Sequence, residues 1–349
     1  MRTGNTPSRW LGLIFLLVLL SFSEGTAWAI LLEMPIDCQI GKTCFIQNYV
    51  DMAPGPDASD HTCGPLTYDK HKGTDFRVTF PEMMQGVKVL AAAPGVVRGA
   101  RDGVMDALYS KRNAAAVQGR ECGNGVVIQH PDGTQTQYCH MRRGSIQVKP
   151  GEQVTTGQVL GLVGLSGQTE FPHLHFEVRI DGNPYCPFTG RIMEGGCGEA
   201  NRPLWTARAL EAMPYVAGGS LGAGFVEVPV KDASVLFSMP NDQPVRPQSA
   251  GLFFWAAFWG IRQGDVIQMR LVPPKGPVWT VPDYTVPGNQ AQYIRFFGRK
   301  LPPEETAWTA GEYRGLAVLL RGGKTIASIV QQITVSDKAG SAQVVSRLP

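Results

Sequence analysis

Short apolar runs separated by glycine and proline are the feature that most restricts how this sequence can fold. The chain has 349 residues, of which 41 are Gly and 26 are Pro, and they follow no Gly-x-y repeat. Such punctuation is typical of a turn-rich β protein and disfavours a helical bundle, a coiled coil or a collagen-like chain. Turn residues between two runs, as in Pro131-Asp132-Gly133, predict antiparallel hairpins. The strands predicted in this first region are Lys88–Ala92, Gly95–Arg98, Gly125–Gln129, Thr134–Met141, Gln158–Gly164 and His173–Ile180.

A second group of strand-like runs occupies residues 225 to about 337. Their aromatic and β-branched content and their spacing predict an immunoglobulin-like β-sandwich. The segment 225–349 contains no His and no Cys, so it offers no evident metal or thiol chemistry and is expected to serve binding or packing. The predicted strands are Phe225–Val230, Leu252–Trp259, Val266–Val272, Tyr313–Leu320 and Ile326–Val335.

The first 29 residues have the layout of a secretory signal peptide. Arg2 and Arg9 form a positive region before the apolar run Leu11–Leu20, and Ala27-Trp28-Ala29 has the small-x-small pattern of a cleavage site. We therefore predict that the chain is exported and that its mature form starts at Ile30. An uncleaved anchor is the disfavoured alternative, because the run is shorter than the roughly 18–20 apolar residues that span a bilayer. The periplasm is the preferred location and release outside the cell is the alternative.

These features divide the chain into five predicted segments. They are a signal peptide (1–29), a Cys-containing lead-in (30–64), a first β domain (65–215) closed by a short helix at Pro203–Met213, a Gly-rich flexible linker (216–224), and a second β domain with a C-terminal tail (225–349). The 32 basic and 29 acidic residues give a net charge of +3 without a basic cluster, so a nucleic-acid partner has no electrostatic support.

Export makes disulfide bonds the expected state of the cysteines. Because their number is odd, at least one is left over, and the sequence does not choose among the many pairings. Closeness in sequence favours Cys38–Cys44 and Cys186–Cys197, which leaves Cys63–Cys122 as a long closure. Cys139 is then the free thiol, expected on the core side of a strand because it alternates with His140. The seven cysteines are Cys38, Cys44, Cys63, Cys122, Cys139, Cys186 and Cys197.

All six histidines lie between positions 61 and 175, and four of them fall in three short motifs. These are His71-Lys-Gly-Thr-Asp75, Tyr138-Cys-His140 and His173-Leu-His175. Two residues apart on a strand, His173 and His175 face the same side. Two imidazoles and one carboxylate leave a tetrahedral position of Zn²⁺ open, which is typical of a catalytic zinc site. An H-E-x-x-H motif, which places zinc ligands on a helix, is absent from the sequence.

These motifs resemble those of the lysostaphin-type, or LytM-like, zinc endopeptidases of peptidase family M23. The family carries H-x-x-x-D, a His in a Tyr-x-His strand, and H-x-H within P-H-L-H-F-E-V, which here is Pro172–Val178. The intervening strands at Val87–Val97, Gly123–Gly133 and Val148–Gly164 are also similar, so the resemblance covers roughly residues 65–190.

The resemblance implies a mostly antiparallel β peptidase domain with one Zn²⁺ per chain. It implies that His71, Asp75 and His175 bind the metal. It also implies that His140 and His173 act on the attacking water and on the developing oxyanion. For Glu177 we favour a solvated or strand-pairing carboxylate over a role in orienting a ligand. His61 and His130 match no family ligand and are interpreted as loop residues.

Two segments depart from the family pattern. Thr169-Glu170-Phe171-Pro172 stands where relatives often have Thr-Gly-Pro, which places a carboxylate and a ring on the approach to the site. An insertion at about 104–121 lengthens a loop near the expected groove, as a loop or a short helix. Both bear on substrate choice, and neither contains a ligand.

The function predicted from the sequence is therefore an exported zinc metalloendopeptidase that hydrolyses peptide bonds in peptidoglycan. The alternative is a LytM-like regulator that holds zinc without turnover and activates a cell-wall amidase. A third and weaker hypothesis is proteolysis of Gly-rich proteins. A protein partner for the second β domain remains an option.

Overall fold

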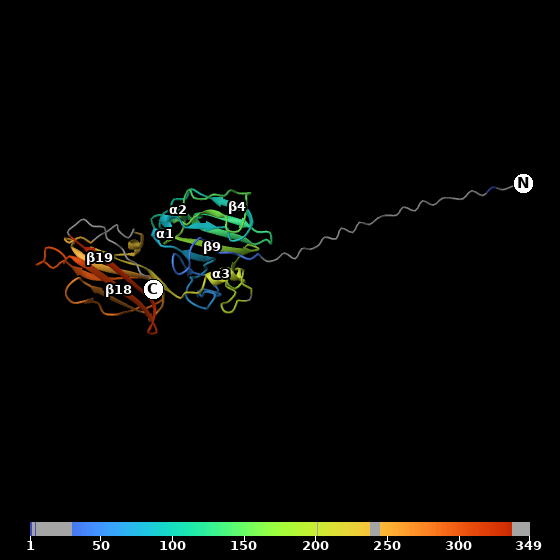
Figure 1. Cartoon of the computed structure of the whole chain (residues 1–349). Coiled ribbons are helices and arrows are strands. Elements are labelled where there is room, and N and C mark those ends of the chain that lie inside the picture. The colour runs from blue at the N-terminus through green and yellow to red at the C-terminus, as the bar shows by residue number, and fades with distance from the viewer. Residues whose placement is uncertain (2–3, 5–29, 201, 238–244, 337–349) are drawn as a thin grey trace.

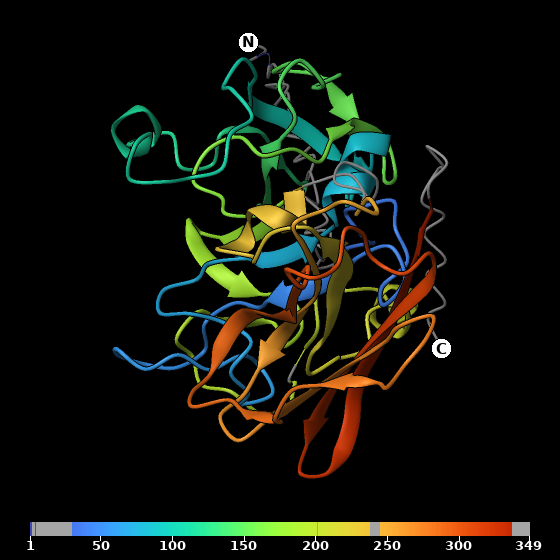
Figure 2. The same cartoon turned by 90° about the vertical axis from the view of Figure 1, so that its left-hand side faces the viewer.

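The computed structural model describes residues 30–200, 202–237 and 245–336, together with Met1 and Gly4. The predicted signal peptide therefore lies almost entirely outside the described residues. Within them, no helix is both long enough and apolar enough to cross a membrane. Figure 1 shows two β-rich bodies, one containing β4 and β9 and the other containing β18 and β19, and Figure 2 turns the second body toward the viewer.

The first body is built on one antiparallel sheet, as predicted. Its strands run in the order β1-β2-β9-β6-β5-β4-β7, with β10 paired to β9 and β11 paired to β10. Their bounds are β1 Phe45–Asn48, β2 Thr74–Arg77, β4 Gly95–Arg101, β5 Asn124–Gln129, β6 Gln135–Met141, β7 Gln153–Val154, β9 His173–Ile180, β10 Asn183–Cys186 and β11 Arg191–Ile192. A smaller pair joins β3 (Lys88–Leu90) to β8 (Val159–Leu162).

Short helices connect these strands. The helix α1 (Phe80–Gln85) begins at a capping box between Thr79 and Glu82, and it ends at Gly86, whose φ of 98° suits glycine. The helix α2 (Ala114–Val117) lies in the predicted insertion. The helix α3 (Ala207–Ala212) confirms the helix expected near residue 203, although it begins only after its N-cap Thr206.

The strands β2 and β9 lie in the interior of the sheet, and each of their two faces carries a different set of side chains. Leu174 and Phe176 of β9 and Phe76 of β2 are fully buried in the core of the first body. Side chains alternate along a strand, so His173 and His175 project from the opposite face. Because apolar residues and histidines alternate along β9, the histidines lie on the face opposite the hydrophobic core.

The second body consists of two antiparallel sheets. One has the order β12-β13-β17, and the other has β15-β14-β18-β19 with β16 paired to β14. The bounds are β12 Gly219–Val226, β13 Gly251–Ile261, β14 Val266–Val272, β15 Trp279–Thr280, β16 Tyr284–Thr285, β17 Gln290–Lys300, β18 Gly311–Arg321 and β19 Lys324–Val335, with a 3-10 turn η1 at Ala233–Phe237.

Both sheets of the second body contribute to one hydrophobic core. Gly315 of β18 lies so close to Phe254 of β13 that a Cβ at this position would come within 2.2 Å of the phenyl ring. The glycine therefore allows the two sheets to approach each other. The layering is compatible with the predicted sandwich, whose immunoglobulin-like topology stays a prediction.

The expectation of a flexible linker at 216–224 is wrong for most of that segment. Residues 219–226 form β12, which pairs with β13. A Cβ at Gly219 would lie 2.7 Å from Nε1 of Trp259, and a Cβ at Gly224 would lie 2.9 Å from Nε1 of Trp255. The glycines make room for indole rings across the strand rather than supplying flexibility. The limits of the two domains stay a prediction.

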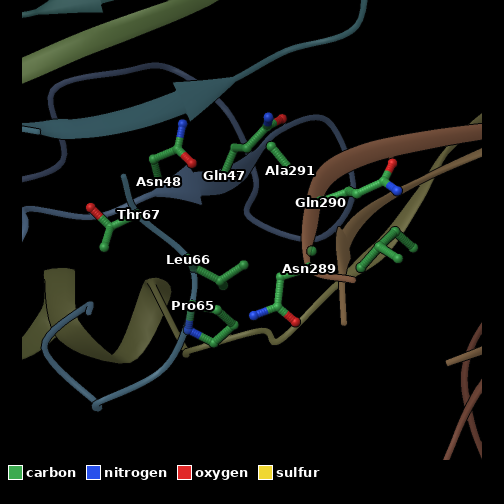
Figure 3. A pocket seen from close by; sticks show the side chains of 10 residues that line it. Gln47, Asn48, Pro65, Leu66, Thr67, Asn289, Gln290 and Ala291 are labelled. Carbon is green, nitrogen blue, oxygen red and sulfur yellow. The ribbon is translucent and has the colours of Figure 1, made fainter. Parts of the chain in front are cut away.

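The two bodies meet along a seam of direct side-chain contacts. The rings of Phe45 in β1 and Trp259 in β13 stack with centroids 4.5 Å apart. Beside them, Arg77 in β2 donates from Nη1 to Oε1 of Gln292 in β17 at 2.9 Å. A pocket of about 120 Å³ lies in the same seam, and Figure 3 shows residues of both bodies around it, among them Asn48 and Asn289.

The disulfide pairing corrects part of the sequence prediction. Cys38–Cys44 is confirmed, whereas the other bonds are Cys63–Cys197 and Cys122–Cys139. Cys122 precedes β5 and Cys139 lies near the end of β6, so the hairpin brings their Cα atoms to 4.8 Å. The free thiol is Cys186, not Cys139, and its burial raises its pKa.

Cys63 lies in a turn that a buried carboxylate holds together. Asp60 accepts hydrogen bonds from the backbone N–H groups of Thr62, Gly64 and Leu66, and from the hydroxyls of Thr62 and Tyr215. Burial by itself raises the pKa of Asp60, but these hydrogen bonds outweigh it and hold the pKa below the usual 3.8. The ionised carboxylate is therefore the form that stabilises this turn.

We expect Asp60→Asn to lower the free energy of unfolding by about 2–3 kcal/mol near neutral pH, because an amide cannot accept all of these bonds. A carboxyl with a lowered pKa in the folded state contributes stability above its unfolded pKa of about 3.8 and loses it as the pH falls through the folded value. The difference between wild type and variant should therefore shrink below about pH 4. Urea unfolding across this range measures it, and a difference that stays constant down to about pH 2 would contradict the assignment.

Candidate active site

Three donor atoms predicted as metal ligands converge in the structure. Nε2 of His71 lies 3.2 Å from Oδ1 of Asp75 and 3.2 Å from Nδ1 of His175, and the last two atoms are 2.9 Å apart. Tetrahedral Zn²⁺ with N and O ligands at 2.0–2.1 Å has ligand-to-ligand separations of about 3.3 Å. The triangle therefore has the size that one zinc ion requires.

His71 is oriented by the residue that directly follows β1. Its Nδ1 donates to the carbonyl of Tyr49 at 2.7 Å, and because a carbonyl only accepts, the proton must sit on Nδ1. Burial lowers the pKa of His71, but the neighbouring Asp75 outweighs it and raises the pKa above the usual 6.5. When Nε2 is unprotonated, its lone pair points at Asp75 and His175. Gly73 makes this approach possible, since a Cβ there would lie 2.7 Å from the ring of His175. Lone pairs that point at one another favour a cation between them.

Asp75 is a buried carboxylate with its two oxygens used differently. Oδ2 accepts from Nδ2 of Asn48 at 2.9 Å, while Oδ1 faces the imidazoles. Burial raises the pKa of Asp75, but the neighbouring His71 and His173 outweigh it and hold the pKa well below the usual value. Asp75 is therefore ionised at neutral pH, as a carboxylate that binds a metal must be.

Because Asn48 bonds the candidate ligand Asp75, we expect Asn48→Ala to weaken zinc binding by roughly 10- to 100-fold. The matched control is Asn289→Ala, which removes an amide from the other side of the seam pocket but touches no ligand. Competition with a chelating dye measures both affinities. Equal zinc affinity of the Asn48 variant and wild type would show that Asp75 needs no such support.

His140 and His173 form a second group beside the triangle. Their ring centroids are 4.6 Å apart, and donor atoms of His140, His173 and His175 lie within 4.8 Å of one another. Nδ1 of His140 donates to the carbonyl of Ser166 at 2.9 Å, and Nδ1 of His173 donates to the carbonyl of Phe171 at 2.9 Å. In both rings Nδ1 is therefore occupied and Nε2 faces the candidate site. Nε2 of His173 lies 3.4 Å from Oδ1 of Asp75.

The backbone of His140 adopts an uncommon conformation. Its φ is 61°, and its N–H donates at 2.8 Å to the carbonyl of Cys122, a residue that lies just before β5. Cys122 is in turn bonded to Cys139, the residue before His140. Burial, together with the positive charge that His173 and His175 can carry, holds the pKa of His140 well below its usual value. At neutral pH His140 is a neutral imidazole able to accept a proton.

Glu177 is neither solvated nor simply strand-pairing. Its side chain is buried, and Arg179 donates to both carboxylate oxygens at 2.8 and 2.9 Å. One oxygen of Glu177 stands 4.0 Å from Nε2 of His175. Alternation along the strand placed Glu177 on the same face as His175, but its burial and its pairing with Arg179 show that the carboxylate is removed from water.

The two remaining histidines lie outside the candidate site, as expected. His61 sits in a turn, stacked on Phe188 with centroids 4.8 Å apart. His130 follows β5 and bonds the carbonyl of Pro94 at 2.8 Å and the hydroxyl of Thr136 at 2.9 Å. Both are loop residues with structural partners.

The two departures from the family pattern lie side by side. The insertion runs past the segment before His173, where the N–H of Tyr109 donates to the carbonyl of Thr169 at 2.8 Å. Its helix α2 stands out from the body in Figure 2. Phe171 packs on His173 with ring centroids 4.6 Å apart. Both segments therefore border the histidine pair.

Sequence reasoning missed Asn48 and Tyr49, which orient two of the proposed ligands. Both belong to the lead-in, which looks irregular in sequence but contributes the strand β1 (Phe45–Asn48) to the sheet edge beside β2. Four residues form too short a run to be recognised, and an Asn before a Tyr carries no signal of its own.

Comparisons with known proteins agree with this geometry. Residues 69–187 match the model of peptidase family M23, which confirms the resemblance drawn from the sequence. A DD-carboxypeptidase/endopeptidase Mpg of Neisseria meningitidis is 29% identical over 153 residues, covering 43% of this chain and 30% of that protein. The peptidoglycan DD-endopeptidase ShyA of Vibrio cholerae is 34% identical over 114 residues, covering 33% and 21%. The chain thus spans less than a third of the length of these curated relatives.

Two solved structures are also similar to part of the chain. A zinc-containing peptidase from Vibrio cholerae shares 25% identity over 45% of this chain and 39% of that chain, with a TM-score of 0.31. The catalytic domain of lysostaphin from Staphylococcus simulans shares 22% identity over 39% and 85%, with a TM-score of 0.26.

Proposed function

Because residues 69–187 match peptidase family M23, we propose that the chain is an exported zinc metalloendopeptidase that hydrolyses peptide bonds in peptidoglycan. The observation that carries the proposal is the convergence of ligand atoms from His71, Asp75 and His175 next to two imidazoles whose Nε2 atoms face the same space. The similarity to the peptidoglycan DD-endopeptidase ShyA supports the choice of peptidoglycan as substrate.

In this proposal His71, Asp75 and His175 hold one Zn²⁺. The donor set fits the ion, since two neutral imidazoles and a carboxylate are ligands that zinc prefers and the separations match its size. Bound zinc supplies Lewis acidity, which lowers the pKa of water to about 7 and polarises a carbonyl group. Its affinity falls in acid, because the ligands must be deprotonated.

His140 and His173 do the proton work in the proposed reaction. Neutral His140 accepts a proton from the attacking water through Nε2, because its Nδ1 is occupied by the Ser166 carbonyl. The proton then goes to the nitrogen of the leaving amine as the C–N bond breaks. For this step His173 is protonated on both ring nitrogens: Nδ1 keeps its hydrogen bond to the Phe171 carbonyl, and the N–H on Nε2 donates to the oxyanion of the tetrahedral species, which stabilises charge where it develops.

Digestion of purified sacculi tests this function. The chain starting at Ile30 is loaded with zinc, its metal content is measured, and released muropeptides are identified by mass. We expect about one zinc per chain and new muropeptides from wild type, and neither from His175→Ala. Full hydrolysis by His175→Ala would contradict the metal mechanism. Bound zinc with intact sacculi, together with stimulation of a wall amidase, would instead identify a regulator.

A further inference from the structure

Arg77 is a buried cation without an anionic partner. It lies in β2, directly opposite His173 of β9 in the strand register. Its exposed fraction is 3%, and no ion pair involves it among the described residues. Its Nη1 instead donates to the amide oxygens of Gln47 and Gln292. Burying a charge with only neutral acceptors is costly, so the position needs an explanation beyond stability.

The guanidinium of Arg77 begins a stack of side chains that ends in the proposed catalytic pair. Its Cζ lies 4.4 Å from the centroid of the Phe171 ring, within the range of a cation–π contact. The other neighbour of Phe171 is His173, with ring centroids 4.6 Å apart, and His173 is 4.6 Å from His140. Arg77, Phe171, His173 and His140 therefore follow one another in contact.

The backbone of the same segment fixes a proton on Nδ1 of His173. The carbonyl of Phe171 accepts from Nδ1 of His173 at 2.9 Å, and the hydroxyl of Thr169 bonds that carbonyl at 2.6 Å. A shift of Phe171 would thus move both the ring that packs on His173 and the acceptor that fixes its proton. Phe171 belongs to the segment in which this chain departs from the family pattern.

The other end of the stack is held by the second body. Gln292 of β17 lies opposite Trp259 of β13, and Trp259 stacks on Phe45 in the first body. Phe45 is also within 5.9 Å of the Arg77 guanidinium. The seam pocket of Figure 3 adjoins this arrangement, because Gln47 lines it. The second body therefore contacts the stack at its outer end.

We propose that Arg77 and Phe171 are positioning residues for His173, and that the second body contributes to the site by holding Arg77 through Gln292. The proposal rests on the proposed function for the role of His173. In this arrangement the second β domain is a part of the hydrolytic site, and its removal or displacement lowers turnover without removing the metal.

The test compares Gln292→Ala, Phe171→Leu and Phe171→Tyr in the zinc-loaded chain, using soluble cross-linked muropeptides as substrate. We expect Phe171→Leu to lower kcat by about 100-fold and Gln292→Ala by about 10-fold, with KM nearly unchanged, because small misplacements of a catalytic group have effects of this order. Phe171→Tyr keeps the ring and should restore most of kcat. Zinc content should stay at about one per chain in all three.

The matched control is Gln290→Ala, which removes the same side chain from the same strand without touching Arg77. It should leave kcat unchanged. Equal kcat values for the Gln290 and Gln292 variants, or loss of zinc in Phe171→Leu, would overturn the proposal. Arg77→Met is a harsher variant that removes the charge, and the milder Gln292→Ala keeps the proposal testable if Arg77→Met fails to fold.

A second readout separates this proposal from the proposed function. Long-range proton–nitrogen NMR spectra of ¹⁵N-histidine-labelled chain report which nitrogen of His173 carries the proton, and they need no turnover. We expect a proton on Nδ1 of His173 in wild type and only partial occupancy of Nδ1 in Phe171→Leu. An unchanged His173 signal in Phe171→Leu would overturn the positioning role, even if the chain cleaves peptidoglycan. The expected change in a chain that does not cleave it would reject only the proposed function.

Discussion

Asp75→Ala is expected to abolish zinc binding and hydrolysis together. Asp75 supplies the only anionic donor of the triangle, and its Oδ1 lies within 3.4 Å of nitrogen atoms of His71, His173 and His175. Without it, the three imidazoles lose the carboxylate oxygen that lies between them. Loss of a partner that merely orients a ligand costs about 10- to 100-fold in metal affinity, so loss of the ligand itself should exceed 100-fold.

The measurement is zinc content after dialysis, combined with chelator competition and digestion of sacculi. Asp69→Ala is the matched control, because Asp69 lies close in sequence to His71 but is exposed and forms an ion pair with Lys70. The control should bind zinc like wild type. An Asp75→Ala chain that retained one tightly bound zinc ion would show that the metal is held by the other group, His140, His173 and His175.

His140→Ala is expected to separate metal binding from catalysis. His140 is outside the ligand triangle, so zinc content should stay at about one per chain. Its neutral imidazole is the proposed proton acceptor, and loss of a general base lowers kcat by about 10²- to 10⁴-fold. Burial and the adjacent His173 and His175 keep the pKa of His140 low, so the wild-type base stays available well below neutral pH.

Steady-state cleavage of soluble muropeptides at fixed zinc occupancy measures the effect. His130→Ala is the control, since His130 is also buried in the first body but bonds only Pro94 and Thr136. It should affect stability and leave kcat nearly unchanged. A His140→Ala enzyme with wild-type kcat would move the role of base to His173.

The second body shows which strands can be predicted from a sequence pattern and which cannot. Strands near 252–259, 266–272, 313–320 and 326–335 were predictable because β-branched and aromatic runs are bounded by turn residues. The strand β17 (Gln290–Lys300) was not, since Arg295 and Gly298 interrupt its apolar pattern. The strand β12 was mistaken for a linker, because its glycines serve the packing of Trp255 and Trp259, which are distant in sequence.

The cysteines show the same difference between contacts that the sequence predicts and contacts that it does not. Cys38–Cys44 closes a short loop and could be predicted from separation alone. Cys63–Cys197 joins residues 134 positions apart, and Cys122–Cys139 depends on the register of the β5–β6 hairpin. Separation in sequence says little about which distant thiols meet.

The sequence by itself determined the β class of the fold, the family resemblance and the five residues of the candidate site, because short motifs carry local chemistry and strand periodicity assigns side chains to faces. Only the tertiary structure decided that Asn48 supports Asp75, that Glu177 is buried beside Arg179, and that Arg77 links Gln292 to Phe171 and His173. These contacts join strands far apart in the chain. They arise from the order and register of the sheet and from the seam between two bodies, which no local pattern encodes.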